Sequence, residues 1–132
     1  MAQTDLWRDI TTTVQRALDA RLDQLTEAGL VRHSDALLAQ LAGLRGAQQL
    51  TTRVLLRRYH TPLHHELCHG QHPRTAGARI TDELCELTRA MLVTVGATEG
   101  VSIEAAVGLA LVLHTRGIAP FCAVPARPTS TA

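Results

Sequence analysis

The sequence predicts an all-α fold, a four-helix bundle of two helical hairpins with a short extra helix in the central connection. Apolar residues recur at intervals of three and four residues along four long segments, which is the period of an amphipathic α-helix. No segment of useful length alternates apolar with polar residues as a strand does. Aromatic residues make up 2% of the chain and hydrophobic residues 45%, so the predicted core is aliphatic. We expect one domain over residues 1–125 and a disordered tail over residues 126–132.

The first predicted hairpin consists of two long helices. Thr4 is a favourable N-cap, and a helical apolar pattern follows over residues 5–28, until Gly29 ends it. Ser34 is the next capping residue and begins a second helix, which runs to His60. The short connection predicts that the two helices are antiparallel neighbours.

A helix break is predicted at Thr61-Pro62, because proline is disfavoured inside a helix and favoured at its first position. We expect a short helix over residues 62–69, which Gly70 ends, and then a loop over residues 71–79. The alternative is one continuous helix with a kink at Pro62.

The second predicted hairpin begins at two further capping residues. Thr81 precedes a third long helix, and Ser102 precedes a last helix that ends at Gly117. Because the last helix is apolar nearly all round, we expect it either at the centre of the bundle or in an oligomer interface. Residues 118–125 contain two prolines and are predicted to form an extended strap.

The three cysteines of the chain, Cys68, Cys85 and Cys122, are an odd number at wide spacing. This pattern does not indicate a disulfide framework, and a reducing cytoplasm is the expected location. The N-terminus lacks the basic and apolar regions of a signal peptide. The longest apolar run, residues 105–113, is shorter than the roughly 20 residues that span a bilayer, so we expect no membrane partner.

The middle of the chain is a basic region that also holds most of the histidines. Residues 36–80 contain six arginines and one carboxylate, Glu66, whereas the segments on either side are net acidic. Five of the seven histidines fall within residues 59–72. Imidazole titrates near neutral pH and is the commonest metal ligand, so this segment is the first candidate for a functional site.

The spacing of these histidines supports a metal-site hypothesis. Histidines four residues apart lie on one helix face at chelating distance, as His65 and His69 would. We take these two as the ligand pair, with Cys68 and His64 as further candidate ligands and zinc as the first choice of transition metal. A third ligand is also expected among Cys85, Glu86 and His114. In the alternative interpretation the histidines form a solvated polar face, and Cys68 is a small buried side chain.

A second arrangement resembles the helical ribonucleases of the HEPN type. Arg58 and His64, with five residues between them, satisfy the Arg-x4–6-His spacing of that family, and Arg53 with His60 is an alternative pair. The resemblance implies RNA cleavage, with the arginine near phosphate. The asparagine that usually stands beside the arginine is missing, because the chain contains none.

The leading functional hypothesis is a small non-enzymatic helical protein that acts as an oligomeric interaction or regulatory module. The apolar last helix and the longer first two helices predict a homodimer, because part of their apolar surface would lack a partner within the chain. The scarcity of aromatic side chains argues against a nucleic-acid partner. A transition-metal-binding protein is the first alternative, and a HEPN-like ribonuclease is the second.

Overall fold

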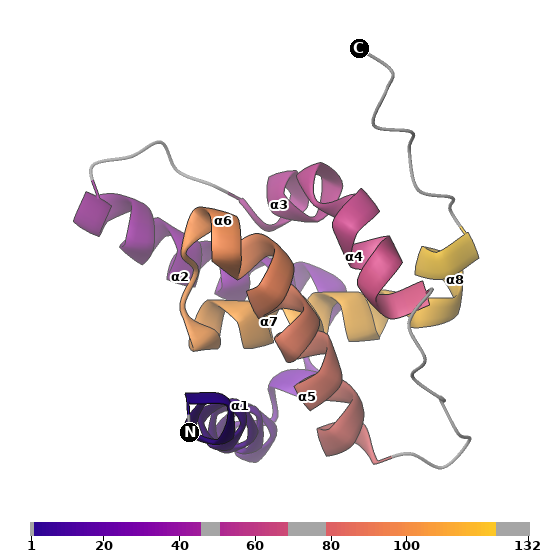
Figure 1. The fold of residues 1–132 in the computed structure, drawn as a ribbon, viewed down its shortest axis with the longest axis horizontal. Helices are drawn as coiled ribbons and strands as arrows, with labels where there is room; N and C mark the ends of the chain where they lie inside the picture. Colours follow the sequence, from indigo (N-terminus) through magenta and orange to yellow (C-terminus); the bar gives the residue numbers. More distant parts are fainter. Residues whose placement is uncertain (1, 46–50, 69–78, 124–132) are drawn as a thin grey trace.

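The computed structural model describes residues 2–45, 51–68 and 79–123. These residues are almost entirely helical and include no strand, which confirms the all-α class (Figure 1). None of their helices has both the length and the apolar character that crossing a membrane requires. Most of the predicted loop over residues 71–79, and the whole predicted tail over residues 126–132, lie outside the described residues.

Helix α7 (Ile103–Arg116) is the centre of the fold. Every residue from Ala105 to Leu113 is buried, as the apolar sequence of this segment predicts. The predicted cap is confirmed, because the Ser102 hydroxyl accepts a hydrogen bond from the Ala105 N–H at 3.1 Å. Three helices pack most extensively against α7 (Figure 1): α1 (Ala2–Asp19), α2 (Glu27–Arg45) and α5 (Ile80–Met91).

The first helix ends earlier than the apolar pattern indicates. It was expected over residues 5–28, but α1 stops at Asp19. Arg21 adopts a left-handed backbone with a φ of 59°, which is incompatible with continued helix, and a short 3-10 turn, η1 (Leu22–Gln24), follows.

Helix α2 begins before its predicted cap. The Thr26 hydroxyl accepts a hydrogen bond from the Gly29 N–H at 3.1 Å and satisfies one of the free donors of the first turn. Glu27 in that turn suits the positive end of the helix dipole. Gly29 and Ser34, predicted as a helix end and a cap, therefore both lie inside α2.

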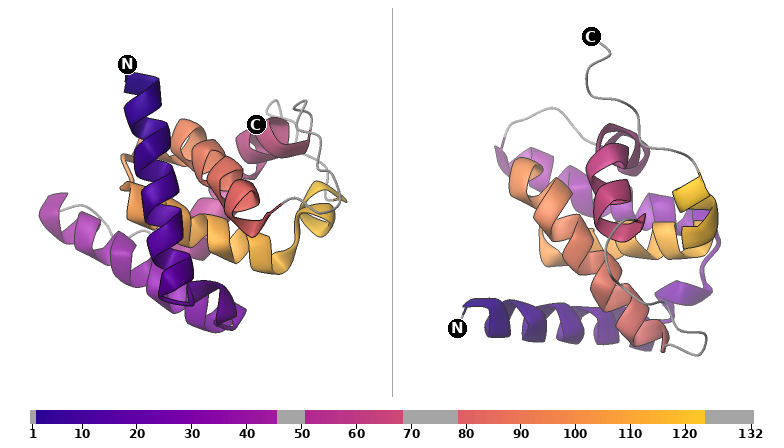
Figure 2. Two further views of the ribbon diagram at one scale, coloured as in Figure 1. Left: turned by 90° about the horizontal axis from the view of Figure 1, so that it is seen from below. Right: turned by 45° about the vertical axis from the view of Figure 1, so that its right-hand side comes forward.

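Ser34 marks a close approach of α2 to α7. Its side chain is fully buried, and its Oγ would lie 3.2 Å from a Cβ placed on Gly108 of α7. Glycine at this position lets the two helices meet. Helix α2 thus packs on α7, and α1 packs on α5 and α7, while the predicted antiparallel pairing of the first two helices is not confirmed. In both views of Figure 2, the N-terminal end of α1 projects beyond the other helices.

Two short helices, α3 (Thr52–Arg58) and α4 (His60–Cys68), follow α2. The break between them falls at Tyr59, slightly before the predicted break at Thr61-Pro62. Pro62 lies in the first turn of α4, where its missing N–H costs no hydrogen bond.

The second half of the chain departs from prediction at both ends of α5. This helix begins at Ile80 without a side-chain cap, so Thr81, the predicted cap, lies inside its first turn. At its other end α5 continues into a π turn, η2 (Leu92–Gly96), and a short last turn, α6 (Ala97–Glu99).

The last described element is helix α8 (Ile118–Ala123), which corrects the predicted extended strap over residues 118–125. The chain turns into it at Gly117, whose φ of 96° favours glycine. Pro120 lies in the first turn of α8, where a helix tolerates proline. None of the six residues of α8 is buried.

Candidate functional site

The histidine segment on α4 lies against α8. The buried His64 donates its Nε2 hydrogen to the Cys122 carbonyl oxygen, 3.2 Å away. A carbonyl oxygen only accepts, so this contact places a proton on Nε2. One turn earlier, the His60 ring lies 4.8 Å from the Phe121 ring, measured between centroids. Side chains of α4 and groups of α8 therefore form one continuous contact.

A disulfide between Cys68 and Cys122 closes the same contact. It joins the last residue of α4 to α8, with the two Cα atoms 5.6 Å apart. The expectation that the cysteines form no disulfide is therefore wrong for this pair, and Cys85 remains as the free cysteine. The disulfide removes the premise on which a cytoplasmic location was predicted, and the location itself stays a prediction.

The predicted metal ligands do not converge within the described residues. His64 is buried and directed toward α8, whereas its neighbour His65 is exposed on another side of α4. Cys68 is oxidised in the disulfide, so it offers no thiolate ligand in this state. His69 lies outside the described residues. Among the residues that are described, no three potential ligands lie close enough to hold a metal ion.

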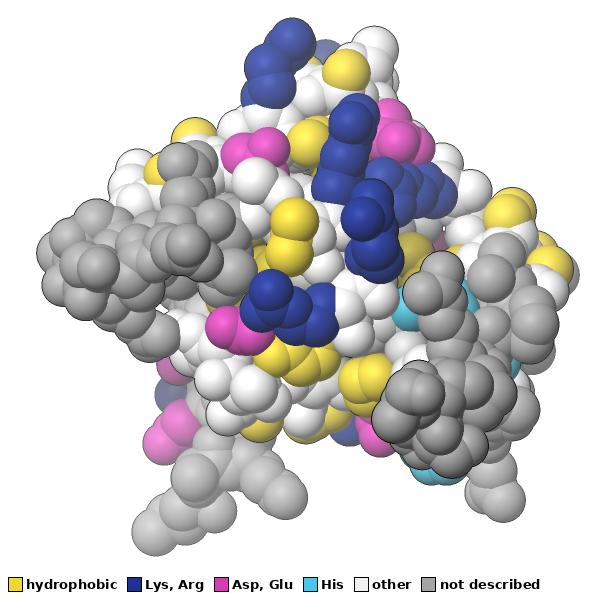
Figure 3. All heavy atoms as spheres, turned by 90° about the horizontal axis from the view of Figure 1, so that it is seen from above, with side chains coloured by type: hydrophobic (Ala, Val, Ile, Leu, Met, Phe, Trp, Pro, Cys, Tyr) yellow, Lys and Arg dark blue, Asp and Glu magenta, His cyan; other side chains and the backbone are white. Residues whose placement is uncertain are grey.

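Three arginines of the predicted basic region, Arg53, Arg57 and Arg58, belong to α3. On the face of the molecule seen from above, Figure 3 shows a group of arginine side chains with histidine to one side. Arg53 and Arg57 are exposed and make no ion pair with any residue in the described ranges. Arg58 instead binds Glu99 of α6, with Nη1 and Oε2 3.1 Å apart.

The two residues of the ribonuclease hypothesis face different partners. Arg58 is held by Glu99, while His64 is hydrogen-bonded to Cys122. The Tyr59 hydroxyl donates a second hydrogen bond to the same Glu99 oxygen at 2.5 Å. Burial, aided by this bond to a carboxylate, raises the pKa of Tyr59 above its usual 10.0. Arg58 and His64 are therefore not directed toward a common point, as phosphate cleavage by this pair would need.

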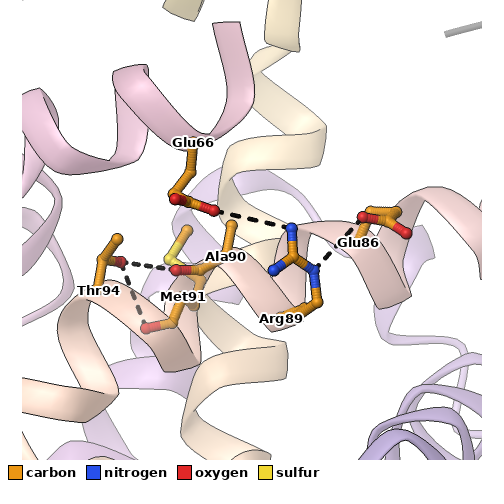
Figure 4. Close-up of polar contacts among 6 residues, drawn as sticks. All are labelled: Glu66, Glu86, Arg89, Ala90, Met91 and Thr94. Atoms are coloured by element: carbon orange, nitrogen blue, oxygen red, sulfur yellow. Dashed lines mark hydrogen bonds and ion pairs between the residues drawn. The ribbon is translucent and has the colours of Figure 1, made fainter. Parts of the chain in front are cut away.

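Glu86 and Cys85, two candidates for a third metal ligand, have other surroundings on α5. Figure 4 shows Arg89 of α5 between Glu66 of α4 and Glu86, with ion-pair distances of 3.7 Å to each carboxylate. Cys85 is buried with its Sγ 3.9 Å from the Thr11 hydroxyl, and burial raises the pKa of its thiol. The thiolate form that a metal or a nucleophile requires is therefore disfavoured.

His114, the remaining candidate, lies on α7 and binds the Glu83 carboxylate of α5 through Nδ1. This contact joins the central helix to a neighbour. Because the His114 ring already has a carboxylate partner, this contact does not support His114 as a metal ligand shared with the histidines of α4.

Comparisons with protein-family models, with curated proteins and with solved structures found no match. The function is therefore inferred from the residues of this chain and their geometry alone.

The sequence pattern missed the residues of α8 that complete the site, Phe121 and Cys122. An extended strap gave no reason to bring them back onto α4. The available signal was the apolar character of residues 118–123, of which Ile118 and Phe121 pack against the core and are partly buried.

Proposed function

We propose that this protein is a small non-enzymatic helical module that works by self-association, as an oligomeric interaction or regulatory protein. The observation that carries the proposal is the outer turn of α1, where Leu6 is 39% and Trp7 is 41% exposed. Large apolar side chains in this state on a projecting helix favour a partner surface.

The outer turn continues an apolar stripe that is buried farther along α1. Ile10 and Val14 are fully buried against the body of the protein. Leu6 lies four residues before Ile10, and Trp7 lies three before it, so all four side chains share one face of the helix. Only the inner part of the stripe is covered, because the N-terminal end of α1 extends past the other helices (Figure 2).

A second copy of the chain is the partner that suits this turn. Its charged residues are of both signs, Asp5, Arg8 and Asp9, so a two-fold pair of α1 helices would place an arginine of one copy near an aspartate of the other. Tryptophan is enriched among the residues that contribute most to interfaces, and Trp7 would lie near the two-fold axis.

Sedimentation velocity over a range of micromolar concentrations tests this proposal. We expect a dimer for the wild type and a monomer for a variant that combines Leu6→Ser with Trp7→Ser. Leu25→Ser is the matched control, because Leu25 is 40% exposed but lies off the stripe, in the turn before α2. Trp7 is the only tryptophan, so its fluorescence should shift to the blue as the wild-type protein associates.

A monomeric wild type at every concentration would contradict the proposal. So would a dimer that survives the loss of Leu6 and Trp7, because another surface would then hold it.

The zinc hypothesis is the second candidate, now with a smaller set of ligands. His65 with His69 remains as its pair, while Cys68 and His64 have other roles in the oxidised protein. Elemental analysis of untagged protein that finds no bound zinc would rule it out.

A further inference from the structure

A cavity of about 320 Å³ lies where α3 and α4 meet the end of α7 and α8. This volume is at the lower end of the range for small-molecule sites. One side of it is bounded by α8, which follows α7 after the turn at Gly117 and is attached to α4 through Cys122.

One side of the cavity is apolar. Leu56 of α3 and Leu113 of α7 are almost fully buried and form its floor, and the Phe121 ring of α8 forms a wall beside His60. An apolar ligand would cover the partly exposed Phe121 ring and would itself leave water, whereas a small inorganic anion would gain nothing from these apolar walls.

The other side is cationic. Arg57 lines the cavity, is exposed, and makes no ion pair with a residue in the described ranges. Arg116 also lines it and is anchored by Glu27 of α2, with Nε and Oε2 3.2 Å apart. Among the described residues, the lining of the cavity therefore contains two arginines and no carboxylate.

We propose that this cavity binds a small organic carboxylate with an aromatic or branched aliphatic body. The planar guanidinium of Arg57 presents two parallel N–H donors, a geometry that matches a carboxylate. The leucine floor and the Phe121 ring take the apolar body of the same molecule. This ligand site is separate from the self-association surface on α1 and does not depend on it.

Isothermal titration calorimetry on the oxidised 132-residue chain tests the site with three probes. The first probe is 1-naphthoate, which has both the carboxylate and an aromatic body. Naphthalene-1-carboxamide keeps the body without the charge, and inorganic phosphate keeps a charge without the body. We expect saturable binding of 1-naphthoate, affinity for the carboxamide that is weaker by about tenfold or more, and no saturable binding of phosphate.

Two arginine variants locate the charge that matters. Arg57→Gln removes the guanidinium at the cavity, and Arg53→Gln removes an equally exposed guanidinium one turn earlier on the same helix, outside the cavity lining. We expect Arg57→Gln to weaken 1-naphthoate binding by about tenfold and Arg53→Gln to change it by less than about twofold. Both are surface substitutions, and equal melting temperatures will verify that both variants fold.

Several results would overturn the proposal. Equal affinity for 1-naphthoate and its carboxamide would remove any role for the charge, and phosphate binding of similar strength would remove any role for the apolar wall. Equal losses in the two arginine variants would indicate a diffuse positive field in place of a site. The absence of saturable 1-naphthoate binding by the wild type would exclude the site outright.

Discussion

His64 donates a hydrogen bond to the backbone carbonyl of Cys122, the residue whose sulfur is bonded to Cys68. Cys68 lies one turn beyond His64 on α4, so a single residue of α8 is held by two side chains of one helix. These two bonds attach α8 to α4, and the partly buried side chains of Ile118 and Phe121 pack it against the core.

We expect reduction of the disulfide to lower the free energy of unfolding by about 2–4 kcal/mol, because the bond links residues 54 positions apart and restricts the unfolded chain. Urea unfolding with and without a dithiol reductant measures the change, and Cys122→Ser should reproduce it. Cys85→Ser is the control, because Cys85 takes no part in the bond and its variant should keep the response to reductant. Alkylation of the unfolded, unreduced protein should label Cys85 alone. Labelling of all three cysteines without reductant would show that the bond is absent.

We expect Gly108→Ala to destabilise the protein by about 1–3 kcal/mol, because the new methyl group would lie 3.2 Å from Ser34 Oγ and 3.3 Å from Ser34 Cβ in a packed interface. Gly29→Ala in α2 is the matched control, with its nearest contact at 3.4 Å, and should be neutral or slightly stabilising. Thermal unfolding of both variants gives the comparison. Combining Gly108→Ala with Ser34→Gly should recover part of the loss; a double variant no more stable than the single one would place the strain elsewhere.

The phenol of Tyr59 should titrate above its usual value of 10.0, because burial and the bond to Glu99 both favour the neutral form. Tyr59 is the only tyrosine, so the ultraviolet absorbance of the phenolate reports this residue directly. A raised pKa in the folded state means that the stability from this group is complete below pH 10 and falls as the pH rises through the folded value. Glu99→Gln should lower the midpoint without returning it fully to 10.0, since burial is the larger cause. A midpoint at or below 10.0 in the wild type would contradict the buried environment.

The features that the sequence predicts correctly are those that local chemistry determines. The position of α7 follows from an apolar segment with no polar face, and its first residue follows from the Ser102 hydroxyl. These signals lie within a few residues of the structure they specify, so no knowledge of the rest of the chain is needed.

The features that the sequence does not predict depend on distant packing. Arg21 is a good helix former, so its own chemistry does not predict the left-handed backbone that separates α1 from α2, both of which pack on α7. Ser34 has the chemistry of a cap but serves as a small residue opposite Gly108. The pairing of Cys68 with Cys122, and with it the inward direction of His64, requires α8 to fold back over a long separation in the chain. The spacing of three cysteines in a sequence does not indicate which two of them form a disulfide.

Because no residue of α8 is fully buried, the side chains that line the cavity at this end of the molecule can change without a matching change in the core. Between the turn at Gly117 and the bond at Cys122, Ala119 and Pro120 are exposed, so their side chains can be exchanged with little effect on the aliphatic core. An exchange at Pro120 would reshape the cavity wall next to Phe121, whose ring lies beside His60. Related chains could therefore diversify what this end of the molecule recognises while the interior around α7 stays unchanged.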